Sequence, residues 1–157
     1  MAPFRLSLAV LCLAGSLLSL SAITAGQGVA KTNPTQESVA SRSAKFATIS
    51  KNDPAVRKAL ACKDLAGATR LAGKPGAFTG VVSSVYSPKD HGSVFIDFSE
   101  PWKNSISGHV KAADYAKFPA LSALKGKQVL ITGAFTLYSH SHPEIQVTSL
   151  SQIKLVK

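Results

Sequence analysis

GKQVLITGAF, residues 126–135, carries the clearest indication of fold class in this chain. Apolar side chains or glycine stand at every second position, at Val129, Ile131, Gly133 and Phe135. This period of two is typical of a β-strand that buries one face, whereas a helix repeats its buried positions every three or four residues. We therefore expect a strand here and look for its partners on either side.

Five more segments show the same alternation, three before this strand and two after it: residues 78–86, 94–98, 106–111, 145–147 and 153–156. A helix-like stretch, residues 114–124, separates the third strand from the fourth. Gly80, Gly108 and Gly133 fall on inward positions of three strands, where glycine permits the sharp coiling of a small closed barrel. Residues 74–157 therefore predict an all-β fold with short helices, a five-stranded OB-type β-barrel.

The N-terminus has the three parts of a secretory signal peptide. Arg5 supplies a positive charge, Leu6–Leu20 is apolar, and small residues follow. We place the signal at residues 1–25, with an end between 25 and 30, and a retained signal anchor is the alternative. The apolar core is shorter than the ~20 residues that span a bilayer as a helix. We expect an exported protein, periplasmic or secreted, with no stable membrane span after signal removal.

Two further segments separate the signal from the barrel. Residues 31–51 are rich in Ser, Thr, Gln, Asn and Lys and predict a flexible polar spacer. Residues 52–73 predict a short helical lead-in, because Asp53 can cap a helix and Pro54 suits its first position. A second weak helical stretch in this lead-in ends at Gly73.

Charge and cysteine content limit the classes of partner. The net charge is +10, and loss of Arg5 with the signal leaves about +9. Such a protein attracts anions, including nucleic acid, anionic polymers and acidic proteins. Cys62 is the single cysteine beyond the signal, so no internal disulfide can form and we interpret it as a small core residue.

Residues 73–156 resemble a group of small bacterial exported OB-fold proteins that are described as nucleic-acid-binding or nucleotide-binding. The matching motifs are Gly80-x-Val82, Val94-Phe95-Ile96-Asp97-Phe98, Pro101-Trp102-x-Asn104, Lys117-Phe118, Gly126-Lys127-x-Val129-x-Ile131-x-Gly133, Tyr138, Pro143-Glu144-Ile145 and Gln152-Ile153. Ser139–His142 replaces a shorter glycine-containing turn of the group. The resemblance implies the barrel fold and a binding role.

OB barrels bind ligands on the face of the second and third strands, between two flanking loops. In this chain those places hold the candidate ligand-binding residues Lys89, Phe95, Trp102, Lys103, His109, Lys111 and Tyr138. Aromatic faces beside ammonium groups are typical of a single-stranded nucleic-acid cleft. The leading hypothesis is therefore a binding module for single-stranded nucleic acid or another oligomeric anion.

An alternative stays open: an envelope module that binds a protein or a small ligand and has no nucleic-acid role. Phe95 and Trp102 could instead cover the open end of the barrel. The three arginines beyond the signal, Arg42, Arg57 and Arg70, all precede the barrel, which therefore lacks the bidentate group that phosphate recognition commonly uses.

Three histidines raise the question of a metal. His140 and His142 share one loop, and His91 sits on the loop expected to face it, so the three could hold zinc or copper. The alternative is a polar loop with exposed histidines. The barrel lacks the arginines and clustered carboxylates of a thermonuclease and shows no phosphate loop or nucleophile elbow. We therefore expect neither an enzyme nor a cofactor.

Overall fold

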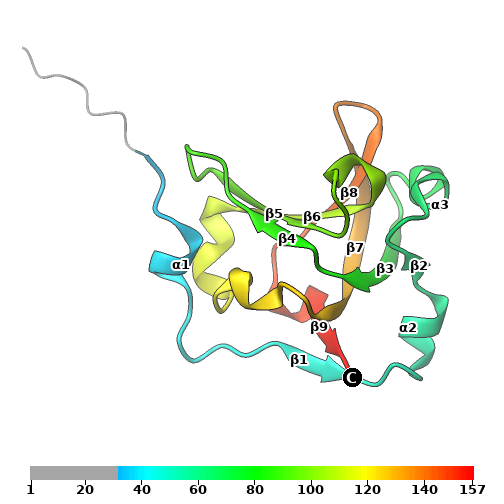
Figure 1. Ribbon diagram of the computed structural model, residues 1–157, viewed down its shortest axis with the longest axis horizontal. Helices are drawn as coiled ribbons and strands as arrows, with labels where there is room; N and C mark the ends of the chain where they lie inside the picture. The colour runs from blue at the N-terminus through cyan, green and yellow to red at the C-terminus, as the bar shows by residue number, and fades with distance from the viewer. Residues whose placement is uncertain (1–31) are drawn as a thin grey trace, which may run out of the picture. The chain divides into compact units, whose positions relative to one another are not determined.

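Nine strands joined in one sheet dominate residues 32–157, the part of the chain that the computed structural model describes (Figure 1). The strands are β1 (Ala47–Ile49), β2 (Leu60–Ala61), β3 (Pro75–Val81), β4 (Ser84–Tyr86), β5 (Ser93–Asp97), β6 (Ser107–Lys111), β7 (Gln128–Tyr138), β8 (His142–Gln146) and β9 (Ile153–Val156). The helices are α1 (Gln36–Val39), α2 (Pro54–Lys58) and α3 (Leu65–Arg70), with 3₁₀ turns η1 (Trp102–Asn104), η2 (Ala112–Lys117), η3 (Leu121–Leu124) and η4 (Leu150–Gln152). The predicted signal peptide lies outside these residues.

The strand pairing makes the sheet curl. β5 pairs antiparallel with β4 and with β6, and β6 pairs in parallel with β8. β8 and β3 both pair antiparallel with the long strand β7, β3 with its first part and β8 with its end. Only Val82 and Ser83 separate β3 from β4. The series of paired strands that begins at β4 and runs through β5, β6, β8 and β7 therefore ends at β3, the strand next to β4 in the chain.

The structure has nine strands within residues 32–157 where the sequence predicted five. The predicted first strand is divided into β3 and β4, the predicted last segment, residues 153–156, forms β9, and the short strands β1 and β2 extend the sheet beyond the prediction. The predicted helix at residues 114–124 is the pair η2 and η3. Phe118, the residue before Pro119, has the extended backbone that a following proline favours, which separates the two turns.

Residues 32–51 belong to the compact unit, although their composition predicted a flexible spacer. The side-chain amide of the buried Gln36 donates to Pro119 O at 3.0 Å and accepts from Leu121 N at 2.9 Å. Downstream, β1 pairs in parallel with β9. One glutamine therefore satisfies backbone groups at the η2–η3 junction, a tertiary contact that polar composition does not reveal.

The helical lead-in forms close to where its capping residues predicted. Asp53 Oδ1 accepts a hydrogen bond from Ala55 N at 2.8 Å at the start of α2. Asp64 Oδ1 does the same with Gly67 N at 2.8 Å at the start of α3. The segment between them contributes β2, and the chain then turns toward β3 through Gly73, whose φ of +78° favours glycine.

The core lies between the curled strands and is built around aromatic side chains. Phe78 packs edge-on against Phe98, with ring centroids 5.1 Å apart, and also contacts Phe135. A Cβ at Gly80 would lie 2.5 Å from Cys62 Sγ and 2.8 Å from the Phe98 ring, so that close approach requires glycine. Cys62 is half-buried against the core, as its surroundings in the sequence indicated. Within residues 32–157, no helix has the length and apolar character needed to cross a bilayer.

Candidate functional site

The alternation of β5, β6 and β8 separates an apolar face from a polar one. Ile96, Val110 and Ile145 are buried in the core. The opposite face of these strands borders a pocket of about 550 Å³, within the range of small-molecule sites. Its lining consists of Ser84, Tyr86, Pro88, Phe95, Asp97, Ser99, Glu100, Pro101, Trp102, Ser107, Tyr138, His142 and Glu144. We call it the acidic pocket.

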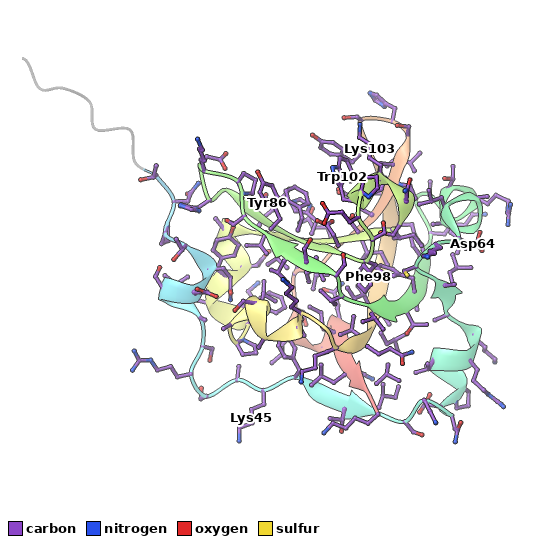
Figure 2. The ribbon with its side chains drawn as sticks, in the orientation of Figure 1. Lys45, Asp64, Tyr86, Phe98, Trp102 and Lys103 are labelled. Carbon is purple, nitrogen blue, oxygen red and sulfur yellow. The ribbon has the colours of Figure 1, made fainter. Side chains whose placement is uncertain are left out.

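Exposed aromatic rings gather around the acidic pocket. Tyr86, Trp102 and Tyr138 are 57%, 39% and 51% exposed, and they are three of the four large exposed hydrophobic residues in the described part of the chain. Trp102 meets Tyr138 edge-on at 6.5 Å and His142 at 4.7 Å between ring centroids. Figure 2 shows Trp102 apart from the core residue Phe98. Aromatic rings left in solvent at one place mark a ligand surface.

Two connections between strands place Trp102 and Tyr138. Trp102 lies on η1, the single turn between β5 and β6. Tyr138 ends β7, where Ser139 and His140 take φ values of +48° and +64° and turn the chain directly into β8. Because β7 and β8 are paired up to this turn, the ring of Tyr138 is held beside His142, its partner in register.

Three carboxylates line the acidic pocket, and two of them are buried. Asp97 is 6% exposed and accepts a hydrogen bond from Ser107 Oγ at 2.9 Å. Burial raises the pKa of Asp97 against the opposing effect of that hydrogen bond. Glu144 is 9% exposed, while Glu100 is exposed at the rim. Among residues 32–157, no lysine or arginine lines this pocket.

His142 links the two buried carboxylates to the rim. Its Nε2 lies 3.3 Å from Ser107 Oγ. Burial lowers the pKa of His142, although the charges of Glu144 and Asp97 act in the opposite direction. The imidazole is therefore neutral near pH 7 and adds no positive charge to the acidic pocket.

His109 lies beside Phe95, its partner in register on β5, and does not line the pocket. Its ring stacks on Phe95 with centroids 5.1 Å apart and an angle of 11° between the planes. Its Nε2 is 3.0 Å from Ser93 Oγ, whereas its buried Nδ1 has no hydrogen-bond partner among the described residues and lies 3.6 Å from Glu144 Oε1. His109 thus supports Phe95 and faces Glu144 without lining the pocket.

A second hollow of about 400 Å³ adjoins the first and shares Trp102, Tyr138 and His142 with it. The remaining residues around it are Leu65, Lys103, Ser139, Ser141 and Pro143. We call it the lysine pocket, because Lys103 is its one charged residue at neutral pH. The Nζ of Lys103 lies 5.6 Å from the centre of the Trp102 ring, and Figure 2 shows the two side chains next to each other.

The structure brings together only some of the predicted ligand-binding residues. Phe95, Trp102 and Tyr138 line the acidic pocket, and Lys103 lines the lysine pocket. The other three predicted residues, His109, Lys89 and Lys111, line neither hollow, and the two lysines are exposed to solvent.

Sequence reasoning missed the acids. Asp97 follows Phe95 by two residues in β5, and the strand period assigns it to the same outward face, but it was not among the predicted ligand-binding residues. Glu144 precedes the buried Ile145 and by the same rule faces away from the core. Glu100 lies in a connection, where no periodic signal exists.

The predicted metal site does not form in the described residues. No three or more side chains of His, Cys, Asp or Glu come together there in a group that could hold an ion. His91 lies against Ser87, with Nδ1 at 3.2 Å from its hydroxyl, while His140 is exposed. His142 is occupied at the pocket wall with Ser107. The three histidines are therefore not gathered around a common point.

No protein-family model matches the chain, and no curated protein matches it. Among solved structures, the chain is similar to one described as a putative aspartyl-tRNA synthetase from Leishmania major Friedlin. The two share 12% sequence identity with a TM-score of 0.46, over 74% of this chain and 23% of that chain. The chain thus spans less than a quarter of that protein's length, and this degree of likeness carries no argument about function.

Proposed function

We propose that the chain is an exported binding protein whose OB-type barrel holds its ligand in the acidic pocket. The order in which β4, β5, β6, β8, β7 and β3 pair supports the barrel. The pocket lies against β5 and β6, the face that such barrels use. The signal-like residues 1–25 support export. The role is binding, without catalysis or a cofactor.

The group that enters the pocket is a cation, such as an ammonium or a guanidinium. One observation carries this proposal: three carboxylates and three exposed aromatic rings surround a pocket that no lysine or arginine lines. Ring faces attract cations by about 0.5–2 kcal/mol. A carboxylate removed from water, as Asp97 is, gains more from a cationic partner than an exposed one does, because less solvent screens the pair.

The positive net charge of the whole chain does not prevent this. Charges separated by more than about 8 Å are largely screened at physiological salt. The ligand therefore responds mainly to Asp97, Glu144 and Glu100 at short range. The lysines elsewhere on the surface slow the approach of a cation without removing its binding site.

Single-stranded nucleic acid is the second candidate, and a specific observation favours it. The three aromatic residues predicted to stack on bases, Phe95, Trp102 and Tyr138, do line one pocket. Stacking contributes roughly 1–3 kcal/mol per base. Phosphates following those bases would meet Glu100 at the rim, however, and the buried carboxylates would oppose them. We therefore rank this ligand below a cation.

The sign of the ligand charge separates the two candidates. Trp102 is the single tryptophan of the chain and lines the pocket, so its fluorescence reports occupancy directly. We expect argininamide to change that fluorescence saturably, and a short oligo-dT to bind more weakly than argininamide. A short oligo-dT that binds while argininamide does not would replace the proposal by the nucleic-acid candidate.

A charge-removing variant locates the site. Glu144→Gln keeps the shape of the side chain and removes one buried pocket charge, so affinity for argininamide should fall about tenfold or more. Glu37→Gln is the matched control, because Glu37 is exposed on α1 and lines neither pocket. Calorimetric titration of both variants measures the difference. Equal losses in the two variants would place the cation elsewhere on the protein.

A further inference from the structure

The acidic and lysine pockets are two halves of one surface with opposite charge. Trp102, Tyr138 and His142 form the wall that both share. On one side of this wall stand the carboxylates, and on the other side stands Lys103. With volumes of about 550 and 400 Å³, the two hollows together exceed what a single small cation would fill.

The opposite charges are not neutralised by each other. Among residues 32–157, Lys103 Nζ has no carboxylate oxygen within 4.0 Å, and the same holds for Glu100 with respect to any cationic nitrogen. Lys103 instead rests against the Trp102 ring. Both charges therefore remain available to a ligand, and a ligand that pairs with both gains more than one that pairs with either.

Hydroxyl groups complete the lysine pocket as a place for an anion. Ser139 and Ser141 line it beside Lys103, and no carboxylate does. Hydroxyls donate hydrogen bonds to carboxylate oxygens, and an ammonium supplies the charge. Leu65 and Pro143 provide apolar surface against which the aliphatic part of a ligand can lie.

From this juxtaposition we propose that the ligand is a peptide segment that carries a basic and an acidic side chain close together. The lysine or arginine of the peptide enters the acidic pocket, its chain crosses the Trp102–Tyr138 wall, and its aspartate or glutamate reaches Lys103. This inference rests on the proposed function, because it keeps the cation in the acidic pocket and adds a second contact. A peptide supplies both charges on one flexible chain, at a spacing that its sequence can adjust.

The test compares capped peptides that differ at one position. In the first series, glutamate follows a single lysine after one, two or three residues, and in the matched series glutamine takes the place of glutamate. In a further pair of series, the glutamate or glutamine precedes the lysine at the same spacings. Trp102 fluorescence of the mature protein gives each dissociation constant. We expect at least one spacing to favour glutamate, by up to about fivefold, as for a solvent-exposed ion pair.

Charge reversal then assigns the effect to one residue. In Lys103→Glu the glutamine peptide should bind better than the glutamate peptide, which inverts the order seen in the native protein. Lys125→Glu makes the same charge change at an exposed site that lines neither pocket, and it should keep the native order. Because both peptides are compared within each variant, a general change in cation affinity cancels.

Each outcome decides between the two proposals. If lysine peptides bind but glutamate gives no advantage at any spacing, the bipolar ligand is excluded while the cation site stands. If argininamide binds but no lysine peptide does, the peptide is excluded and the cation site stands; if neither binds, both proposals fail. Free arginine, tested beside argininamide, carries both charges on one small molecule. If free arginine binds more tightly than argininamide by as much as the glutamate peptides exceed the glutamine peptides, the ligand is a zwitterionic amino acid and the peptide is ruled out. An unchanged order in Lys103→Glu would also overturn the inference.

Discussion

Ile96 and Asp97 are adjacent in β5, and they belong to two different regions of the molecule. Ile96 is completely buried in the apolar core. Asp97, 6% exposed, points to the other side of the strand, where it meets Ser107 and lines the acidic pocket. Successive side chains of a strand point to opposite faces, so one strand serves two purposes. The face toward the core stabilises the fold, and the other face presents charge to a ligand.

The same division recurs on β8, where Ile145 enters the core and Glu144 lines the pocket. Because β6 and β8 pair in parallel, with Ser107 opposite Glu144, the polar residues of three strands collect on one side. Substitutions on the two faces should therefore have separable effects, on unfolding for the core face and on binding for the pocket face.

The largest effect is expected on the core side. Ile96→Ala removes a fully buried side chain and leaves a cavity, so the free energy of unfolding should fall by about 2–5 kcal/mol. Urea denaturation followed by circular dichroism measures it. As long as the variant is folded, its affinity for argininamide should match the native value; a folded variant with a lost site would show that the two faces are coupled.

The neighbouring residue should behave in the opposite way. Asp97→Asn keeps an acceptor for Ser107 and removes the charge, so cation affinity should fall by about 1.5–3 kcal/mol, or roughly tenfold to a hundredfold. Calorimetric titration with argininamide gives the affinity, and denaturation of the same sample gives the stability.

Stability of Asp97→Asn at pH 7 should be unchanged or higher. Burial raises the pKa of Asp97, so the native state holds this proton more tightly than the unfolded chain does. The free energy of unfolding therefore decreases as the pH rises above about 4, the ordinary pKa of an aspartate, because the buried side chain loses its proton. Asparagine does not ionise, so the variant should not show this decrease. A destabilised Asp97→Asn would show that the carboxylate belongs to the structural face after all.

A smaller effect is expected at the rim. Trp102→Ala removes one exposed ring face from both pockets, which should weaken cation binding by about 0.5–2 kcal/mol. Trp102→Phe should restore part of it, since phenylalanine keeps a weaker ring face. Calorimetry is the readout here, because both variants lack the tryptophan signal. Equal affinity in the alanine variant and the native protein would remove the ring from the site.

The smallest effect is a pH dependence set by two groups of the pocket. Burial raises the pKa of Asp97 and lowers that of His142. As the pH falls between about 6.5 and about 4, His142 gains positive charge and Asp97 loses negative charge, and both changes disfavour a cation. Three neighbouring charges also act on these groups: Glu100 raises the pKa of Asp97, Glu144 raises the pKa of His142, and Lys103 lowers it.

Affinity for argininamide should therefore decline severalfold on acidification across this range. Titrations in the native protein and in His142→Gln separate the contributions, because the variant should lose the part of the decline that comes from imidazole protonation. An affinity that rises toward low pH would contradict the proposed sign of the ligand.

Local sequence patterns were sufficient for much of the fold. The period of two located β3 to β9 to within a few residues, and Asp53 caps the start of α2 as predicted. In the site, Phe95, Trp102 and Tyr138 were predictable because aromatic residues near strand ends and turns stand out in a short barrel. These features depend on neighbours in the chain and on backbone geometry that each residue type carries with it.

Other features required contacts between distant residues. Residues 32–51 were predicted as a flexible spacer because no local pattern shows that Gln36 reaches the backbone at Pro119 and Leu121. Likewise, no local pattern shows that Lys89 and Lys111 stand outside the pocket or that His91 stays apart from His142.

The order of residues along the chain was enough to indicate which residues alternate, where the first helix begins and that the chain as a whole is basic. The sign of the charge at the site depends on contacts between strands that are distant in the sequence. Asp97 and Glu144 come from separate strands, β5 and β8, and both line one pocket because β6 pairs with each of these strands, with Ser107 opposite Glu144 and hydrogen-bonded to Asp97. Net charge is a sum over the chain, whereas a ligand experiences the few groups within several ångströms of it, so a basic protein can present an acidic pocket.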